Sequence, residues 1–232
     1  TGAEKWKSAV TLPGDVIWGI ATPSTAAVAA GSQKTIFISS MWPGSEGVYA
    51  FRHDGTLKWK YPTTLAVATS VTVTDLDDDG HPEAIFTDGI GLMKDQAAEG
   101  GQLYVLNAED GTLRWKSGDT LPGTTIELSM AVSVYDIDGD GQSELVTGSS
   151  TGGLYAFSRT GTLKWSYPTP YPVVAPPVLA DLDGDGKTDV VFVGMGAPFT
   201  GSTGSRLVVL NGLDGTLKWS SEQVLPGREY GS

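Results

Sequence analysis

The chain has 232 residues, of which 40% are hydrophobic and 18% are charged, a composition that excludes a disordered polymer and allows one large domain with a substantial core. Because the sequence contains no cysteine, disulfides, thiol catalysis and thiolate metal sites are excluded. The formal net charge is -12 and no basic stripe is present, so nucleic acid is not expected as a ligand.

The chain starts with a short motif that returns throughout the sequence. Residues 2–6 read Gly-Ala-Glu-Lys-Trp, and the related pentapeptide Gly-Thr-Leu-(Lys/Arg)-Trp follows at intervals of roughly 50 residues. The complete copies end at four tryptophans: Trp59, Trp115, Trp165 and Trp219. Repeats of this length are typical of solenoids and propellers, and the lack of helical periodicity disfavours a helical solenoid.

The first repeat contains an uncharged run, residues 16–33, with the length of a membrane span. The run includes Pro23, Gln33 and several serines and threonines, and it aligns with strand positions of the later repeats. We therefore expect two strands and a turn there, and no membrane span. We also expect that a signal peptide has been removed ahead of Thr1, because the chain begins without an apolar leader.

The second repeat shows how each unit is built. Runs of alternating or β-favouring residues predict strands over 70–74, 84–86, 102–106 and 112–115. Four antiparallel strands in each unit predict an all-β fold, a single β-propeller domain over 1–232 built from four four-stranded blades. The approximate blades are 9–59, 60–115, 116–165 and 166–219.

Hairpin turns are expected between the last two strands of every unit. Asp-Gly occurs there at 54–55, 110–111 and 214–215, and Thr-Gly at 160–161. Each motif tryptophan stands beside such a turn, so we expect Trp59, Trp115, Trp165 and Trp219 to wedge between adjacent blades rather than to bind a ligand.

Alternate units differ in a way that makes a pair of blades the true repeat. The second blade of each pair carries a long glycine-rich connection, over 89–101 or 194–204. Loops at the same place in alternate blades emerge on one face, which is a candidate binding surface. Trp42 in the first unit could stack on a sugar, or only cover an apolar patch.

The fourth strand occurs in five copies but the first three strands in only four. A surplus outer strand is therefore expected at 1–8 or 213–220, and unpaired edges invite addition of another strand. Three assemblies stay open: a four-bladed monomer, one half of a larger, eight-bladed propeller, and an assembly completed by exchange of a strand with a neighbouring chain.

An acidic tract of the form Asp-x-Asp-x-Asp-Gly-x-x-(Asp/Glu) occurs once in each of the second, third and fourth blades, at 75–83, 136–144 and 181–189. Carboxylates at positions 1, 3, 5 and 9 around a turn-forming glycine supply the hard oxygen ligands that Ca²⁺ requires. Position 12 carries no Glu, so a β-hairpin loop is expected rather than an EF-hand. We expect the backbone carbonyl of position 7 and water to complete each site.

The tracts thus predict three Ca²⁺ sites, and the first blade, which has lost its acids over 27–38, is expected to have none. We expect calcium to staple each hairpin, because converging carboxylates repel one another without a cation. The predicted ligands are Asp75, Asp77, Asp79, His81 and Glu83 in the first loop, Asp136, Asp138, Asp140, Gln142 and Glu144 in the second, and Asp181, Asp183, Asp185, Lys187 and Asp189 in the third.

Residues 134–148 and 179–194 resemble FG-GAP/VCBS repeats, the calcium-binding propeller repeats of integrin α-chain heads and of many bacterial and archaeal surface proteins. The resemblance covers most of the chain and implies a propeller with calcium in the acidic loops. The pentapeptide is similar to the blade motif of quinoprotein-like propellers, whose quinone and metal ligands have no counterpart in this sequence. Eight-bladed rhamnogalacturonan lyases also resemble the chain in combining such loops with propeller blades.

A non-catalytic, calcium-binding propeller that serves adhesion or assembly at a cell surface is the function we expect. Its partner would be a protein or a glycan, self-association through a terminal strand is an alternative, and calcium-rich surroundings favour an extracellular or cell-surface location. A lectin-like propeller using Trp42 or Met93, a strand-exchanging subunit, and part of a polysaccharide lyase stay open. No enzyme is expected, although the separations of the loop acids Asp88, Asp95, Glu99, Glu127 and Glu46 are unknown.

Overall fold

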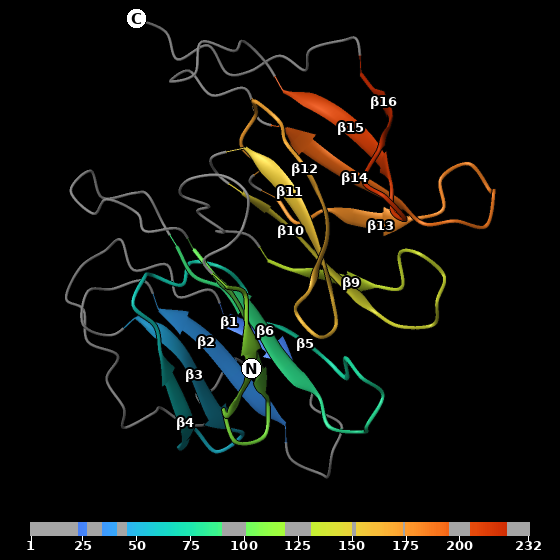
Figure 1. The fold of residues 1–232 in the computed structure, drawn as a ribbon. Coiled ribbons are helices and arrows are strands. Elements are labelled where there is room, and N and C mark those ends of the chain that lie inside the picture. The colour runs from blue at the N-terminus through green and yellow to red at the C-terminus, as the bar shows by residue number, and fades with distance from the viewer. Residues whose placement is uncertain are drawn as a thin grey trace, which may run out of the picture.

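The computed structural model describes residues 23–26, 34–40, 46–89, 101–118, 131–149, 152–173, 175–194 and 205–221. In these ranges the chain forms strands and turns, arranged as four antiparallel sheets of four strands each (Figure 1). The predicted all-β, four-bladed architecture is confirmed. None of the described segments has the length and hydropathy of a membrane-spanning helix.

Every sheet is a meander in which each strand pairs with the next one along the chain. The first sheet contains β1 (Pro23–Ala26), β2 (Thr35–Ser40), β3 (Gly47–Arg52) and β4 (Leu57–Pro62). The second contains β5 (Thr72–Thr74), β6 (Glu83–Thr87), β7 (Leu103–Asn107) and β8 (Leu113–Lys116). The third contains β9 (Ser133–Tyr135), β10 (Glu144–Ser149), β11 (Gly153–Ser158) and β12 (Leu163–Tyr167), and the fourth contains β13 (Val178–Ala180), β14 (Asp189–Gly194), β15 (Arg206–Asn211) and β16 (Leu217–Ser220).

The strands predicted in the second repeat correspond to β5, β6, β7 and β8 within a few residues. β6 and β10 are buried along their whole length, because a sheet lies against each of their faces. The exact blade ranges stay a prediction. Residues 1–8, Trp42, Met93 and most of the long connections lie outside the described residues, so the surplus strand at 1–8 and the candidate binding surface stay predictions as well.

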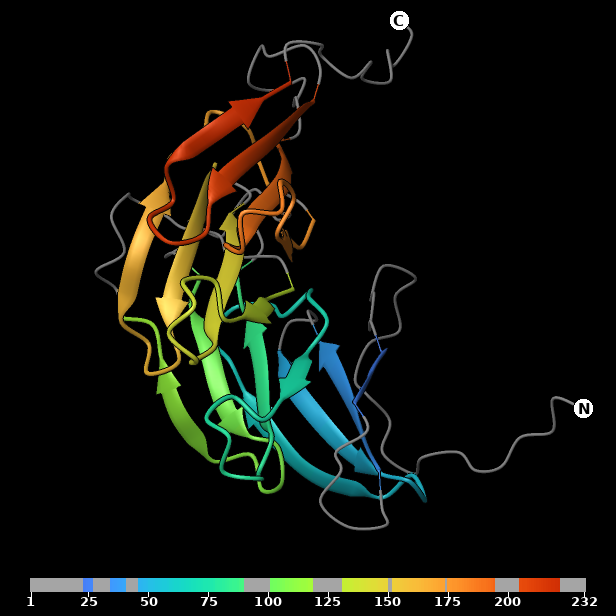
Figure 2. The same ribbon diagram turned by 90° about the vertical axis from the view of Figure 1, so that its right-hand side faces the viewer.

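The sheets stack face to face along an arc, with the first sheet at one end and the fourth at the other (Figure 2). Each of the three interfaces between neighbouring sheets is filled by its own hydrophobic cluster. The second, third and fourth sheets are also linked by side-chain hydrogen bonds. Thr72 Oγ1 in β5 donates to the carbonyl of Val132, just before β9, at 2.7 Å, and Ser133 Oγ in β9 donates to the carbonyl of Pro177, just before β13, at 2.5 Å. Burial between stacked sheets, rather than within any one of them, therefore supplies the core.

The predicted hairpin turns between third and fourth strands are present in all four sheets. Gly111 illustrates them: its φ of +76° is in the region that favours glycine, and its N–H donates to the Asn107 carbonyl at 2.9 Å. Asp110 braces the turn by accepting from the N–H of Thr112 at 2.9 Å and from its hydroxyl at 2.7 Å. In the third sheet Thr160 replaces this aspartate, and Ser158 Oγ accepts from the Thr162 N–H instead, at 3.1 Å.

Three of the four motif tryptophans wedge between sheets as predicted. Each donates its indole N–H to a carbonyl in the hairpin turn of the next sheet: Trp59 to Ala108 at 3.2 Å, Trp115 to Arg159 at 2.9 Å and Trp165 to Gly212 at 2.7 Å. The rings cover the turn glycines so closely that a Cβ at Gly111, Gly161 or Gly215 would lie within 3 Å of a ring atom. Trp219 differs from the prediction, because it lies on the fourth sheet and the residue is 48% exposed.

Candidate metal centres

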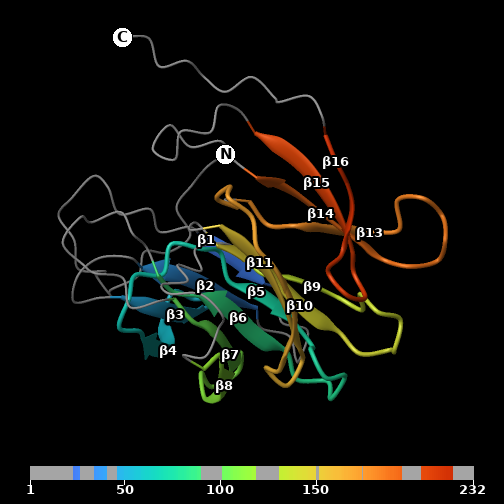
Figure 3. The same cartoon turned by 45° about the horizontal axis from the view of Figure 1, so that its top comes forward.

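The three acidic loops occupy equivalent places, each joining the first and second strands of its sheet. They connect β5 to β6, β9 to β10 and β13 to β14. Figure 3 shows them on the same side of the molecule, following one another around the arc. The first sheet has no such acids, and Thr35 stands at the register position that Glu83, Glu144 and Asp189 occupy in the other sheets.

The aspartate at position 1 closes each loop by accepting two backbone N–H groups, one on each carboxylate oxygen. Asp136 accepts from Gly139 at 2.7 Å and from Gly141 at 2.9 Å. The third loop repeats this pair of bonds, from Gly184 at 2.8 Å and Gly186 at 2.9 Å onto Asp181. In the first loop Asp75 accepts from Gly80 at 2.8 Å and, at position 5 rather than position 4, from Asp79 at 3.1 Å. The tight curl that these bonds stabilise brings the remaining acids of the loop together.

Positive φ angles at positions 4 and 6 allow this curl. Glycines fill both positions in the second and third loops, with φ between +76° and +83°. In the first loop position 4 is Asp78, which has a φ of +60° and is the one residue other than glycine with a positive φ among those described. An aspartate tolerates this conformation better than most residues, but at a cost that glycine avoids.

The acid at position 9 is the first residue of the second strand and is buried. Glu83, Glu144 and Asp189 are each 1% exposed. One oxygen of each accepts the backbone N–H of position 2, from Leu76 at 2.7 Å, Ile137 at 3.0 Å and Leu182 at 3.2 Å. Burial raises the pKa of Glu83 and of Glu144, an effect that their hydrogen bonds only partly offset.

Positions 1, 3 and 9 of each loop form a compact carboxylate group. Oxygen atoms of the three acids lie within 4.8 Å of one another in each of Asp75/Asp77/Glu83, Asp136/Asp138/Glu144 and Asp181/Asp183/Asp189. One Ca²⁺ ion, with oxygen ligands at roughly 2.3–2.6 Å, can touch oxygens separated by that distance. The donor chemistry and the spacing therefore fit a hard divalent cation.

Positions 5 and 7 do not join these groups. The carboxylates of Asp79, Asp140 and Asp185 accept from the backbone N–H of position 7, with distances of 2.7, 2.7 and 2.8 Å to His81, Gln142 and Lys187. Their predicted role as ligands, like that of the position 7 carbonyls, stays a prediction.

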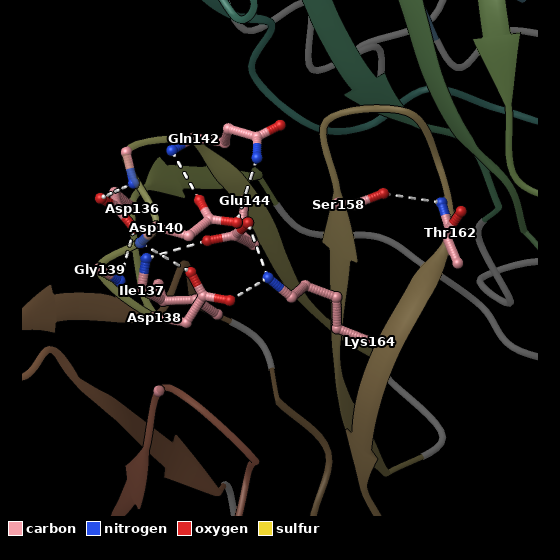
Figure 4. A network of polar contacts seen from close by, with 12 residues as sticks. Asp136, Ile137, Asp138, Gly139, Asp140, Gln142, Glu144, Ser158, Thr162 and Lys164 are labelled. Atoms are coloured by element: carbon pink, nitrogen blue, oxygen red, sulfur yellow. Dashed lines mark hydrogen bonds and ion pairs between the residues drawn. The ribbon is translucent and has the colours of Figure 1, made fainter.

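A basic side chain, which the sequence did not point to, faces every carboxylate group. It is the residue before the motif tryptophan: Arg114, Lys164 or Lys218. Figure 4 shows Lys164 beside Asp138 and Glu144 of the second loop. Lys164 contacts Asp138 and lies 3.0 Å from Glu144, and Lys218 lies 2.8 Å from Asp183 and 2.7 Å from Asp189. Hydrogen bonds from Lys218 to Asp183 and Asp189 raise the pKa of the lysine, so that it stays charged.

Two of these acidic loops lie in a segment that matches a known protein family. The model of the FG-GAP-like repeat matches residues 136–192, which include the second and third acidic loops. No curated protein matches the sequence.

Solved structures share the propeller fold at low sequence identity. The C-terminal domain of PilY1 from Pseudomonas aeruginosa is similar with a TM-score of 0.61 and 16% identity, over 81% of this chain and 47% of that one. BBS1N in complex with ARL6DN gives a TM-score of 0.58 and 11% identity, over 88% and 55%. BamB from Moraxella catarrhalis gives 0.52 and 20%, over 85% and 47%. The chain thus spans about half the length of these propellers.

Proposed function

We propose that the protein is a calcium-binding β-propeller module that serves adhesion or assembly outside the cell. The observation that carries the proposal is the recurrence of one carboxylate group, at the same place, in three successive sheets. A match to the FG-GAP-like repeat across two of these loops supports it.

The carboxylates at positions 1, 3 and 9 would hold the ion in each loop. Bound calcium would neutralise the negative charge of the three converging carboxylates. The protein's own part is to place position 1 on the loop and position 9 on the second strand, so that one ion joins the two. This arrangement supports a structural role for calcium, with the partner bound elsewhere on the propeller.

We propose that the protein binds a protein or glycan partner and is not an enzyme. His53 and His81, the two histidines of the chain, are exposed and lie on loops of different sheets. The propeller BBS1N is seen in complex with another protein, ARL6DN, which supports a protein partner for this fold.

Equilibrium dialysis against ⁴⁵Ca²⁺ tests the metal part of this proposal. We expect binding at three sites per chain, loss of one site in each of the variants Asp77→Asn, Asp138→Asn and Asp183→Asn, and a fall in melting temperature on addition of EDTA. Magnesium is the matched control ion, because it loses its bound waters reluctantly and is seldom held by protein ligands alone. A wild-type protein that retains no calcium and melts identically with and without EDTA would contradict the proposal.

Adhesion is tested by the retention of cells on beads that carry the protein, in calcium and in EDTA. Retention that is lost in EDTA and in the triple variant of the same three aspartates is the expected result. Equal retention on uncoated beads would reject the adhesive role while leaving the metal result intact.

Assembly of several molecules is a second candidate, favoured by the exposed indole of Trp219. The equivalent tryptophans of the other sheets each cover the hairpin turn of a following sheet. We propose that Trp219 covers such a turn in a neighbouring molecule. Sedimentation equilibrium should then show a concentration-dependent oligomer that Trp219→Ala converts to a monomer, and an oligomer unaffected by the substitution would reject this interface.

A further inference from the structure

The basic residue before each motif tryptophan makes the same contacts in three sheets. Arg114, Lys164 and Lys218 each contact the acids at positions 3 and 9 of their own loop. Their side chains are 34%, 24% and 19% exposed, so the positive charges lie at the edge of the carboxylate groups rather than in bulk water.

The contact at position 9 engages the oxygen that a metal ion would need. In Glu144, Oε2 accepts from the Ile137 N–H and Oε1 from the Lys164 ammonium. In Asp189, Oδ2 accepts from the Leu182 N–H and Oδ1 from the Lys218 ammonium. The oxygen of position 9 that the backbone leaves accessible is therefore the one that the basic side chain holds.

A β-bulge in each fourth strand places the basic residue there. Trp165 pairs with Ala156 and Leu163 with Phe157, so Lys164 between them is the extra residue of the bulge. The pairing shifts at the equivalent point in all four sheets. An extra residue changes the direction in which its side chain points, and here it directs the basic group across the sheet toward the loop.

The first sheet provides a natural comparison. Its basic residue, Lys58, occupies the same bulge but faces Thr35, whose Oγ1 lies 3.4 Å from the ammonium. Thr35 is the counterpart of the position 9 acids and carries no charge. The first sheet therefore has the lysine without the acids. A substitution of Lys58 can show what the loss of a basic residue does to this strand position when no acidic loop faces it.

We propose that Arg114, Lys164 and Lys218 are built-in counter-cations that hold the acidic loops closed without metal and compete with calcium for the carboxylate at position 9. This inference rests on the proposed calcium binding. It predicts that the loops do not open fully when calcium leaves, because the basic side chain takes over part of the neutralisation. It also predicts that each site binds calcium more weakly than its carboxylates alone would.

The sites should differ in strength. Arg114 contacts Asp77 with both terminal nitrogens and Glu83 with one of them, and it lies 3.9 Å from Asp79 as well. Each lysine has one ammonium for two acids. The planar guanidinium is the better fit to two carboxylates. We therefore expect the first loop to bind calcium most weakly.

The variant Lys164→Met, which keeps an unbranched side chain of similar length but removes the charge, tests the proposal in the full chain. The N–H of Gly141 donates to Asp136, so its amide NMR signal reports on the second loop alone. A calcium titration should show binding to this loop on the order of tenfold tighter than in the wild type, as expected from removal of a like charge a few ångströms from the ion. In EDTA the variant should melt at a lower temperature than the wild type.

Two controls make the result decisive. Lys58→Met removes the same charge beside Thr35 and should leave calcium affinity unchanged, and Lys164→Arg should restore stability in EDTA. Unchanged affinity and unchanged melting in Lys164→Met would overturn the inference even though the wild type binds calcium. A wild type that binds no calcium, together with a Lys164→Met variant that melts lower, would reject the calcium proposal and the competition while upholding the closing role of the lysine.

Discussion

The indole nitrogen of Trp165 lies 2.7 Å from the carbonyl oxygen of Gly212, in the hairpin turn of the next sheet. Trp165 is 8% exposed, whereas its counterpart at the end of the arc, Trp219, is 48% exposed. We expect Trp165→Ala to cost about 3–5 kcal/mol of unfolding free energy, because it leaves a cavity between sheets and an unpaired carbonyl. Trp219→Ala, measured by urea denaturation of the monomer, should cost less than about 1 kcal/mol.

These two substitutions are matched controls for one another, since both remove the tryptophan of the same motif. Equal costs would mean that Trp219 is as well packed in solution as Trp165.

The aspartate at position 4 of the first loop is expected to lower stability. Asp78 has a φ of +60° where the other two loops have glycine. Asp78→Gly should stabilise the protein by about 0.5–1 kcal/mol in EDTA, because the relief of the left-handed conformation outweighs the greater freedom of glycine in the unfolded chain.

The reciprocal change, Gly139→Asp, should destabilise the second loop by a similar amount, since no atom lies within 4 Å of a Cβ at this position and backbone strain is the main effect. Urea denaturation of both variants measures these changes in the free energy of unfolding. A loss of stability in Asp78→Gly would show that the aspartate side chain stabilises the loop by more than its left-handed backbone conformation costs.

Two aspartates of the second loop should differ in their effect on calcium affinity. Asp138 belongs to the carboxylate group, whereas Asp140 accepts from the N–H of Gln142. Asp138→Asn should weaken calcium binding by more than about tenfold, and Asp140→Asn by clearly less, because only the first removes a clustered charge. Isothermal titration calorimetry measures both, and equal losses would favour the full ligand set predicted from the sequence.

Asp88 should make stability depend on pH in a way that Asn does not. The carboxylate is 2% exposed, and it accepts from the Gln102 N–H and the Tyr104 hydroxyl, each at 2.8 Å. Burial raises the pKa of Asp88 above its ordinary value of 3.8, an effect that these hydrogen bonds and Lys116 only partly offset. Since the folded-state pKa is raised, the charged form reduces stability above that pKa, and the penalty disappears as pH falls through it toward 3.8.

Asp88→Asn keeps the shape of the side chain and should be at least as stable as the wild type at pH 7, with an advantage that shrinks toward pH 4. Thermal melting at a series of pH values measures the difference. Asp88→Leu, which removes the acceptor of both hydrogen bonds, should be less stable throughout this range. A constant difference between Asn and wild type from pH 4 to 8 would contradict the raised pKa.

The strands and turns are predictable from the sequence because their signals are local. Alternation over 70–74 and Asp-Gly at 110–111 need no knowledge of distant residues. The carboxylate groups are predictable for the same reason, since positions 1, 3 and 9 belong to one loop. The contact of Lys218 with Asp183 joins residues 35 positions apart, and its geometry depends on a bulge that has no local signature. The same motif also has a basic residue, Lys58, in a sheet without these acids, so the motif alone does not indicate that its basic residue pairs with an acid.

Lys164 and Trp165 are consecutive, yet one faces the acids of its own loop and the other fills the joint with the neighbouring sheet. On the proposals above, an ion that displaces the ammonium from Glu144 would act on the strand one peptide bond from that joint. Arg114 and Trp115 are consecutive in the same way, with Arg114 in contact with Glu83 and Trp115 bonded to the turn of the next sheet. If the proposed calcium binding holds, we expect the force at which the stacked sheets separate, when the protein is pulled from its ends, to differ between calcium-rich and calcium-poor solutions.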